Sequence, residues 1–233
     1  LSAIFRYAVA TLRADSDPAA ALKGALHRPP VQHRRPLDPK AIVKLLKQLD
    51  DFGGYRSTQI ALRLLLLTFV RPVELRAGEW PEFDLDAGEW RIPPERMKMR
   101  REHIVPLSHQ AVALLRELHE LTGGGRLLFP NHRRPKTHMS ATTLNRALER
   151  LGYSGRFSAH GFRATASTIL NEIGYNPDWI ERQLAHAPRN KVRASYNQAV
   201  YLPERRKMMQ QWADHLDALA TGAEVSALHR KRA

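Results

Sequence analysis

The segment from Ile60 to Phe69 reads IALRLLLLTF and is apolar on nearly every side when wound as a helix. A helix without a polar face is typical of the middle of a domain, because it has no side to turn toward water. Its continuous apolar run, Leu64 to Leu67, is far shorter than the roughly 20 residues that a membrane span needs. We therefore expect the chain to fold as a globular domain built around this helix.

The segments around this helix predict the elements that cover it. Asp38 followed by Pro39 indicates a helix start, with proline at the first helical position. Two alternating apolar segments, 80–85 and 90–92, flank an Asp-Ala-Gly turn, and a third follows at 103–106, as is typical of a small antiparallel sheet. Helical spacing of apolar residues returns in 108–121, 161–172 and 202–219. The predicted fold class is mainly α with a small three-stranded antiparallel β-sheet.

The charge of the chain points to a kind of partner. The 233 residues include 37 Lys and Arg against 23 Asp and Glu, so the formal net charge is 37 − 23 = +14. This excess predicts a polyanionic partner, nucleic acid first, although a soluble basic protein without such a partner fits the same number. The absence of cysteine excludes disulfides, thiolate zinc sites and a cysteine nucleophile. With no recognisable signal peptide, we expect a cytoplasmic protein with no membrane partner.

Four residues suited to phosphoryl chemistry are concentrated between residues 159 and 196. The sequence A-H-G-F-R places His160 and Arg163 on one face of a predicted helix. The sequence Q-L-A-H ends at His186, and nine residues separate this histidine from Tyr196. Arginine offers paired donors to phosphate oxygens, histidine transfers protons, and tyrosine can attack once its proton is removed. The stretch therefore holds the residue types needed to bind a phosphodiester and to attack it.

Two further candidates precede this stretch. Behind the central helix the chain reads T-F-V-R-P-V-E-L, with Arg71 directly after the apolar run and Glu74 one turn later. A charge in such a place is costly without a partner, so Arg71 either pairs with Glu74 or faces a site at the helix end. The basic run R-M-K-M-R-R, which contains Lys98, lies between the second and third predicted strands.

Together these motifs resemble those of the tyrosine recombinases, the phage-type integrases, over about residues 36–219. The family's first arginine motif is usually T-G-x-R-x-x-E-L; here Phe69 replaces the glycine and Pro72 follows the arginine. The family's catalytic lysine lies on the turn between the second and third strands, and Lys98 is the residue that matches it. The resemblance implies the DNA breaking–rejoining fold of the tyrosine recombinase catalytic domain.

The resemblance also implies a reaction and a role for each residue. Tyr196 attacks one DNA strand and leaves a 3′-phosphotyrosine and a free 5′ hydroxyl, without ATP, metal or another cofactor. Tyr201 lies nearby, but the family's nucleophile follows the last histidine at about the distance of Tyr196. The other implied roles are phosphate binding for Arg71, Arg163 and His186, general acid for Lys98, general base or orienting donor for His160, and support of a histidine or arginine for Glu74.

Basic residues outside these motifs are candidates for contact with the DNA backbone, although each run also reads as solvated surface charge. The candidates are Arg34, Arg35, Arg100, Arg101, Arg133, Arg134 and Lys136. No carboxylate cluster has metal spacing, and His103, His109 and His119 do not form a ligand set. We therefore expect no metal site.

The expected domain organisation has four parts. Residues 1–28 resemble the C-terminal remnant of a DNA-clamping, core-binding domain, 29–37 a linker, 38–220 the catalytic domain and 221–233 a tail. Because the first residue is not methionine and already reads as helix, we expect a piece of a longer protein. The last helix either docks on a neighbouring copy or packs on its own domain.

The implied function is integration of a phage or other mobile element by site-specific DNA recombination. The implied partners are double-stranded DNA with attachment sites, further copies of the chain in a tetramer on DNA, and a directionality factor or host DNA-bending protein. A type IB-like topoisomerase shares this constellation and would relax a plasmid that lacks any specific site. A catalytically silent DNA-binding regulator of the same fold is the third possibility, and it would form no covalent adduct with DNA.

Overall fold

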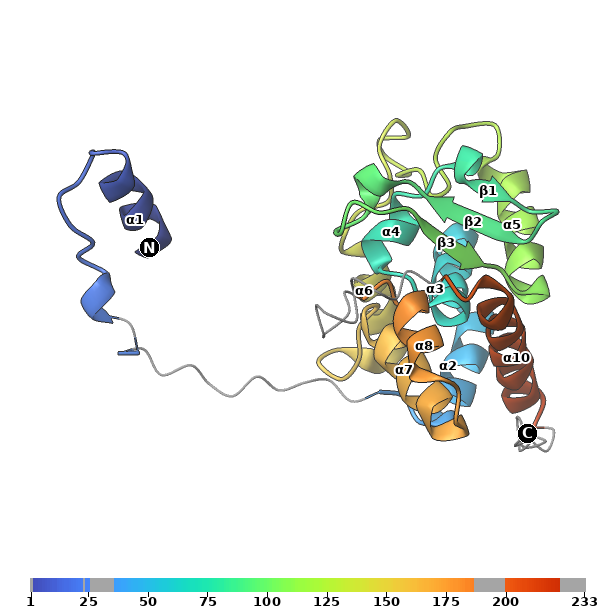
Figure 1. Cartoon of the computed structure of the whole chain (residues 1–233). Coiled ribbons are helices and arrows are strands. Elements are labelled where there is room, and N and C mark those ends of the chain that lie inside the picture. The colour runs from blue at the N-terminus through green and yellow to red at the C-terminus, as the bar shows by residue number, and fades with distance from the viewer. Residues whose placement is uncertain (1, 23, 26–35, 187–199, 223–233) are drawn as a thin grey trace. The chain divides into compact units, whose positions relative to one another are not determined.

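The computed structural model describes residues 2–22, 24–25, 36–186 and 200–222 (Figure 1). It divides into two units, Leu1–His33 and Arg34–Ala233. The first unit contains helix α1 (Ser2–Ala10) and a short 3-10 helix, η1 (Ala20–Leu22), neither of which has a buried residue.

Helix α3 (Arg56–Thr68) is the centre of the second unit, as its all-round apolar sequence predicts. Every residue from 57 to 62 and from 64 to 68 is buried. Helices α5 (His109–Thr122), α6 (Thr143–Leu148), α7 (Gly161–Ile173) and α10 (Leu202–Thr221) pack around it. Helix α2 (Pro39–Asp50) begins as predicted, because the Asp38 side chain accepts a hydrogen bond from the Ala41 amide.

The predicted three-stranded antiparallel sheet is confirmed, with strand order β1-β2-β3. Its strands are β1 (Phe83–Asp84), β2 (Glu89–Ile92) and β3 (His103–Pro106), and Trp90 pairs with Val105. The first strand is shorter than its alternating sequence predicts, since Trp80–Glu82 form a 3-10 helix, η2. Proline at position 81 has no amide hydrogen for a strand ladder, which favours this early turn.

The remaining elements connect the sheet to the helices. Helix α4 (Pro72–Arg76) follows α3, and a 3-10 turn, η3 (Pro94–Arg96), follows β2. A π-turn, η4 (Glu149–Tyr153), extends α6, and α8 (Pro177–Gln183) follows α7. In Figure 1 the sheet and α5 occupy the upper half of this unit, with α2, α7, α8 and the lower turns of α10 beneath them. No helix within the described ranges has both the length and the apolar character that a bilayer crossing requires.

Helix α10 packs on its own domain, one of the two alternatives that its sequence allowed. Its buried side chains include Met208 and Trp212, and the helix contacts α2, α3, α8 and β3. The Trp212 indole donates to the Leu66 carbonyl of α3 at 2.8 Å, and its ring meets Phe69 edge-on. The buried C-terminal end of α3 therefore finds hydrogen-bond donors from elements far along the chain.

Candidate active site

Arg71 stands at the junction of α3 and α4, where it is held on two sides. Its Nη1 donates to Glu74 Oε1 at 2.6 Å, and its backbone amide donates to Glu74 Oε2 at 2.8 Å. Its Nη2 donates to the Ala185 carbonyl at 3.1 Å, just beyond the end of α8. The two interpretations of Arg71 are therefore compatible: it pairs with buried Glu74, and it also faces a cluster of charged groups.

Arg163 projects from the first turn of α7 and is almost completely buried. Its Nη1 donates to the Phe69 carbonyl at 2.8 Å, and its Nη2 donates to the Leu184 carbonyl at 2.7 Å. The same Nη2 lies 3.1 Å from His186 Nε2. Burial, and to a lesser extent the charge of Arg71, lowers the pKa of Arg163 to about 10. The guanidinium therefore stays protonated at neutral pH and supplies a fixed positive charge.

His186 has its two ring nitrogens in different roles. A guanidinium can only donate, so Nε2 accepts from Arg163. The ring hydrogen then lies on Nδ1, which is 2.8 Å from the Glu181 carboxylate and donates to it. Nε2 can donate to a phosphate oxygen, the role that the family resemblance implies, only after it gains a proton.

His160 lies at the start of α7, directly before the glycine of the A-H-G-F-R motif. A Cβ at Gly161 would meet the Phe157 ring at 2.5 Å, so glycine is needed for the aromatic side chain to pack against this turn. Partial burial lowers the pKa of His160, and the charges of Arg163 and Arg71 lower it further. At neutral pH the ring therefore carries a lone pair that can accept a proton.

The other two predicted catalytic residues are Lys98 and Tyr196. Lys98 is exposed on the turn between η3 and β3, and it makes no hydrogen bond or ion pair to the part of the chain that the structure describes. Tyr196 lies outside the described residues, whereas Tyr201 directly precedes α10. The choice of nucleophile therefore stays a prediction.

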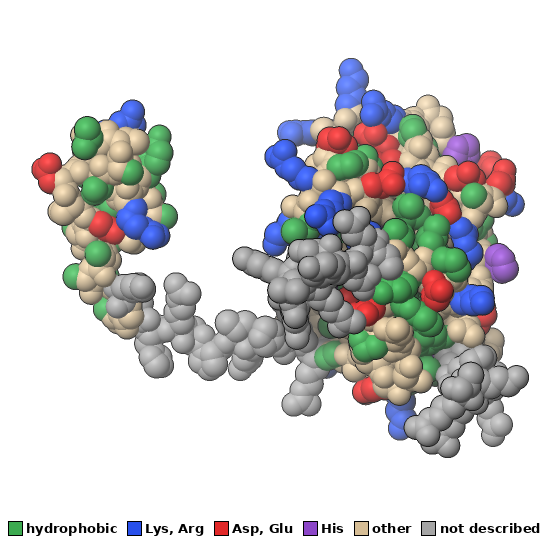
Figure 2. Space-filling model, in the orientation of Figure 1, with side chains coloured by type: hydrophobic (Ala, Val, Ile, Leu, Met, Phe, Trp, Pro, Cys, Tyr) green, Lys and Arg blue, Asp and Glu red, His purple; other side chains and the backbone are tan. Residues whose placement is uncertain are grey.

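The candidates for DNA contact lie on exposed turns or outside the described ranges. Arg100 and Arg101 are exposed before β3, and Arg133, Arg134 and Lys136 are exposed in the loop before α6. Arg34 and Arg35 are not among the described residues. In Figure 2, Lys and Arg side chains gather along the upper left edge of the second unit.

Three residues of the site carry no motif signal. Glu181 sets the ring hydrogen of His186, and the carbonyls of Leu184 and Ala185 anchor the two arginines. These two carbonyls follow the last turn of α8, where positive charge is favoured by the helix dipole. Glu181 is visible in the sequence as a carboxylate five residues before His186. The sequence does not show that Ala185, directly before His186, adopts the left-handed conformation with φ of 49°.

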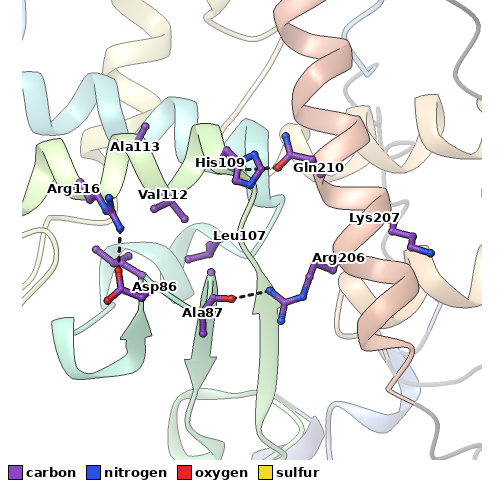
Figure 3. A pocket seen from close by; sticks show the side chains of 12 residues that line it. Asp86, Ala87, Leu107, His109, Val112, Ala113, Arg116, Arg206, Lys207 and Gln210 are labelled. Carbon is purple, nitrogen blue, oxygen red and sulfur yellow. Dashed lines mark hydrogen bonds and ion pairs between the residues drawn. The ribbon is translucent and has the colours of Figure 1, made fainter.

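A pocket of about 620 Å³ lies between the β1–β2 turn, α5 and α10 (Figure 3), and none of the predicted catalytic residues lines it. Within the described ranges, no three histidine, aspartate or glutamate side chains are grouped as a metal ion would need. The site is a cluster of arginine donors and histidine rings, and its fixed positive charge suits an anionic oxygen.

Comparison with known proteins identifies relatives of the chain. The integrase of Enterobacteria phage P4 is 44% identical across 93% of this chain and 53% of its own length. The prophage integrase IntA of Escherichia coli K12 is 39% identical across 97% of this chain and 54% of its own length. The chain thus spans about half the length of the curated relatives that it matches.

Solved structures share the fold at low sequence identity. The integrase of mycobacterium phage Brujita has a TM-score of 0.60 at 18% identity over 90% of this chain and 68% of its own. The lambda integrase dimer bound to a core site has a TM-score of 0.59 at 18% identity, over 80% of this chain and 69% of its own. These structures confirm the predicted tyrosine recombinase fold. The model of the phage integrase family matches residues 35–201, which is well over half of the 233 residues, so the chain belongs to this family.

Proposed function

We propose that the chain contains the catalytic domain of a site-specific DNA recombinase that integrates phage-like or other mobile DNA. The observation that carries the proposal is the convergence of Arg71, Arg163 and His186, from three elements far apart in the sequence, on one hydrogen-bonded cluster. Family membership supports the same activity, because the relatives named above are integrases.

In the proposed reaction, the Tyr196 oxygen attacks the scissile phosphorus. A bond forms between phosphorus and the tyrosine oxygen as the bond to the 5′ oxygen breaks. His160 accepts or orients the tyrosine proton, and Lys98 gives a proton to the leaving 5′ oxygen. The 3′-phosphotyrosine retains the energy of the diester, so a 5′ hydroxyl of a partner strand can reverse the step without ATP.

Stabilisation of charge is the main task of the remaining groups. The transition state of phosphoryl transfer places negative charge on the nonbridging oxygens. Arg71 and Arg163 bind these oxygens, and His186 adds a donor once it is protonated. Glu74 keeps Arg71 in place through the two hydrogen bonds described above.

The partners follow from the same reaction. Double-stranded DNA with attachment sites is the substrate, and Arg34, Arg35, Arg100, Arg101, Arg133, Arg134 and Lys136 contact its backbone. Solved relatives of this fold include the Tn1549 integrase in complex with circular intermediate DNA. Strand exchange joins two duplexes and requires a tetramer of the protein on DNA. A directionality factor or a host DNA-bending protein assists it, and the reaction takes place in the bacterial cytoplasm.

The proposed domain organisation has four parts. Residues 1–28 belong to a DNA-clamping domain, 29–37 form the linker, 38–220 the catalytic domain and 221–233 a tail.

A nicked suicide substrate that carries candidate attachment sequences tests this function. Cleavage next to the nick frees a short fragment that carries the 5′ hydroxyl. Once this fragment diffuses away, the strand cannot be rejoined, and the covalent complex accumulates as a band that resists SDS. The band should be lost in Tyr196→Phe and kept in Tyr201→Phe. The opposite pattern would move the nucleophile to Tyr201. Absence of the band with the whole protein and its native sites would refute the recombinase proposal and favour a DNA-binding regulator.

A further inference from the structure

Arg205, in the first turn of α10, is a fully buried cation. Its Nε and Nη2 donate to Gln183 Oε1 at 3.1 Å and 2.6 Å. Nη2 also donates to the Ile104 carbonyl of β3 at 2.6 Å, and Nη1 to the Val200 carbonyl at 3.3 Å. Among the residues that the structure describes, no carboxylate contacts it. Burial is the main reason that its pKa falls to about 9.

A buried charge without a counterion is unfavourable, and apolar residues of similar volume often stabilise a core better. Packing alone therefore does not account for arginine at this position. The guanidinium instead donates to three acceptor groups on three separate parts of the chain. These parts are the end of α8, strand β3 and Val200. Val200 comes four residues after Tyr196 in the sequence.

Gln183 connects Arg205 to the active site. This residue is also fully buried, and its Nε2 donates to the Thr68 carbonyl at the end of α3 at 3.2 Å. Its own carbonyl accepts from His103 Nε2 at 3.1 Å. The next two carbonyls along the chain are those that hold Arg163 and Arg71, and His186 follows. The turn at 183–186 therefore sets the position of all three phosphate-binding groups.

We propose that Arg205 is a positioning residue of the DNA-cleaving site, which fixes the turn at 183–186 through Gln183 and thereby holds His186, Arg71 and Arg163 in place. The inference rests on the proposed function. Arg205 does not touch the DNA; it acts through the turn that it holds. Its geometry cannot be reproduced by lysine, whose donors radiate from a single nitrogen, whereas the guanidinium presents a rigid planar fork.

Arg206 offers a matched control one residue further along α10. Its Nη1 donates to the Ala87 carbonyl at 2.8 Å, and its Nη2 pairs with Glu89 at 2.7 Å. Figure 3 shows this side chain directed to the β1–β2 turn, beside the pocket. Arg205→Lys and Arg206→Lys are therefore the same chemical change at adjacent positions, and only the first concerns the turn at 183–186.

The first measurement is the rate of covalent adduct formation on two suicide substrates, one with a normal scissile phosphate and one with a methylphosphonate. A methyl group in place of one nonbridging oxygen removes the negative charge that the arginines hold. Arg205→Lys should slow cleavage of the normal substrate by about tenfold or more, and of the methylphosphonate by less than about threefold. Arg206→Lys should leave both rates within about twofold of wild type. An equal loss on both substrates, or no loss, would overturn the proposal.

The second measurement does not depend on activity. The ¹⁵N chemical shifts of the His186 ring in the free protein report which nitrogen carries the hydrogen. Wild type and Arg206→Lys should show the Nδ1–H form, and Arg205→Lys a mixture of the two forms. If Arg205→Lys does not fold, Gln183→Met removes the hydrogen bonds between Arg205 and Gln183 from the other side. It should give the same change in the ¹⁵N chemical shifts of the His186 ring.

The two measurements separate the failure of the two proposals. If the ¹⁵N chemical shifts of the His186 ring in Arg205→Lys equal those of wild type, the positioning role is overturned, even when wild type cleaves DNA. A wild-type protein that forms no adduct on either substrate would refute the proposed function, and the ring shifts would still decide whether Arg205 positions the turn.

Discussion

At the scale of single residues, the two arginines of the site use only some of their donors on protein atoms. A guanidinium has five N–H donors. Toward the described part of the chain, Arg163 uses three, on two carbonyls and the His186 ring, and Arg71 uses two, on Glu74 and one carbonyl. Both arginines are therefore fixed by protein atoms and still keep donors for phosphate oxygens. Donors fixed in advance need no reorganisation in the transition state, which is where their effect on rate arises.

Glu181 should raise the rate of cleavage through His186. Its carboxylate accepts the Nδ1 hydrogen and fixes the orientation in which Nε2 faces Arg163. Glu181→Gln keeps an acceptor oxygen but removes the charge, so we expect cleavage to slow by about tenfold. Single-turnover adduct formation measures this. Glu172→Gln, an exposed change on α7, is the control, and a wild-type rate in Glu181→Gln would contradict the role.

His103 should make the stability of the domain depend on pH. Burial, followed by the charge of Arg205, lowers its pKa from 6.5 to about 3, and Nε2 donates to the Gln183 carbonyl. The unfolded chain therefore binds a proton near pH 6.5 that the folded chain does not bind. This contribution is complete above that pH and is lost progressively as the pH falls toward 3. Between pH 7.5 and 5.5 the loss amounts to about 1.4 kcal/mol.

His103→Gln tests this dependence, because glutamine can donate to the same carbonyl and does not titrate. Urea unfolding at the two pH values should show that the free energy of unfolding of the variant falls by about 1.4 kcal/mol less than that of wild type. Carboxylates and the other histidines titrate in both proteins, so they cancel in this comparison. An equal fall in both proteins would mean that His103 is already protonated in the folded state at pH 5.5.

At the scale of elements, the sequence predicts the helices and strands that are determined by residues within the element itself. The apolar run of α3 and the Asp38 cap of α2 are such local signals, and the structure confirms both. The alternation in 80–85 predicts a full strand, but Pro81 cannot join a ladder and a 3-10 turn takes its place. Phe69 has a left-handed φ of 39°, where the family usually has glycine, and its fully buried ring packs against Trp212. Burial of that ring offsets a strain that only glycine would avoid.

The supports of the site could not be predicted, because their partners are backbone carbonyls far along the chain. Arg163 reaches Phe69 across 94 positions, and Arg205 reaches Ile104 across 101. A carbonyl belongs to every residue, so such pairs leave no mark in composition or spacing. The motif residues themselves are visible, because phosphoryl transfer restricts their residue types.

Lys98, on the turn between η3 and β3, should act only on the leaving group. In a substrate whose 5′ bridging oxygen is replaced by sulfur, the leaving thiolate is much more stable than an alkoxide and needs no general acid. Lys98→Ala should therefore slow cleavage of normal DNA by about a hundredfold or more, and of the sulfur substrate by less than about tenfold. Adduct yield over time measures both rates. Arg100→Ala on the same turn should change the two rates equally, and the same pattern in Lys98→Ala would exclude the role of general acid.

At the scale of the whole molecule, the net charge is +14, and the basic side chains are of two kinds. Some form ion pairs with acidic side chains, and others do not. Arg116 pairs with Asp86 at 3.0 Å, and Arg126 pairs with Glu79 at 2.8 Å. Arg133 and Arg134 are exposed beside the Asn131 side chain, which binds their backbone amides, and neither forms an ion pair with the described residues. The unpaired arginines in this loop are therefore free to replace counterions on a phosphate backbone.

Salt dependence should separate these two kinds of charge. Each phosphate contact adds about 0.9 to the slope of log affinity against log salt, so Arg133→Gln combined with Arg134→Gln should lower the slope for duplex binding by about 1.8. The loss should be similar on specific and non-specific DNA, because contacts to the backbone carry no sequence information. Fluorescence anisotropy between about 50 and 200 mM salt measures the slope. Arg116→Gln should leave the slope unchanged, since Asp86 already neutralises that side chain. If the double variant keeps the wild-type slope, this loop does not contact DNA, and the charge that binds the duplex lies elsewhere on the molecule.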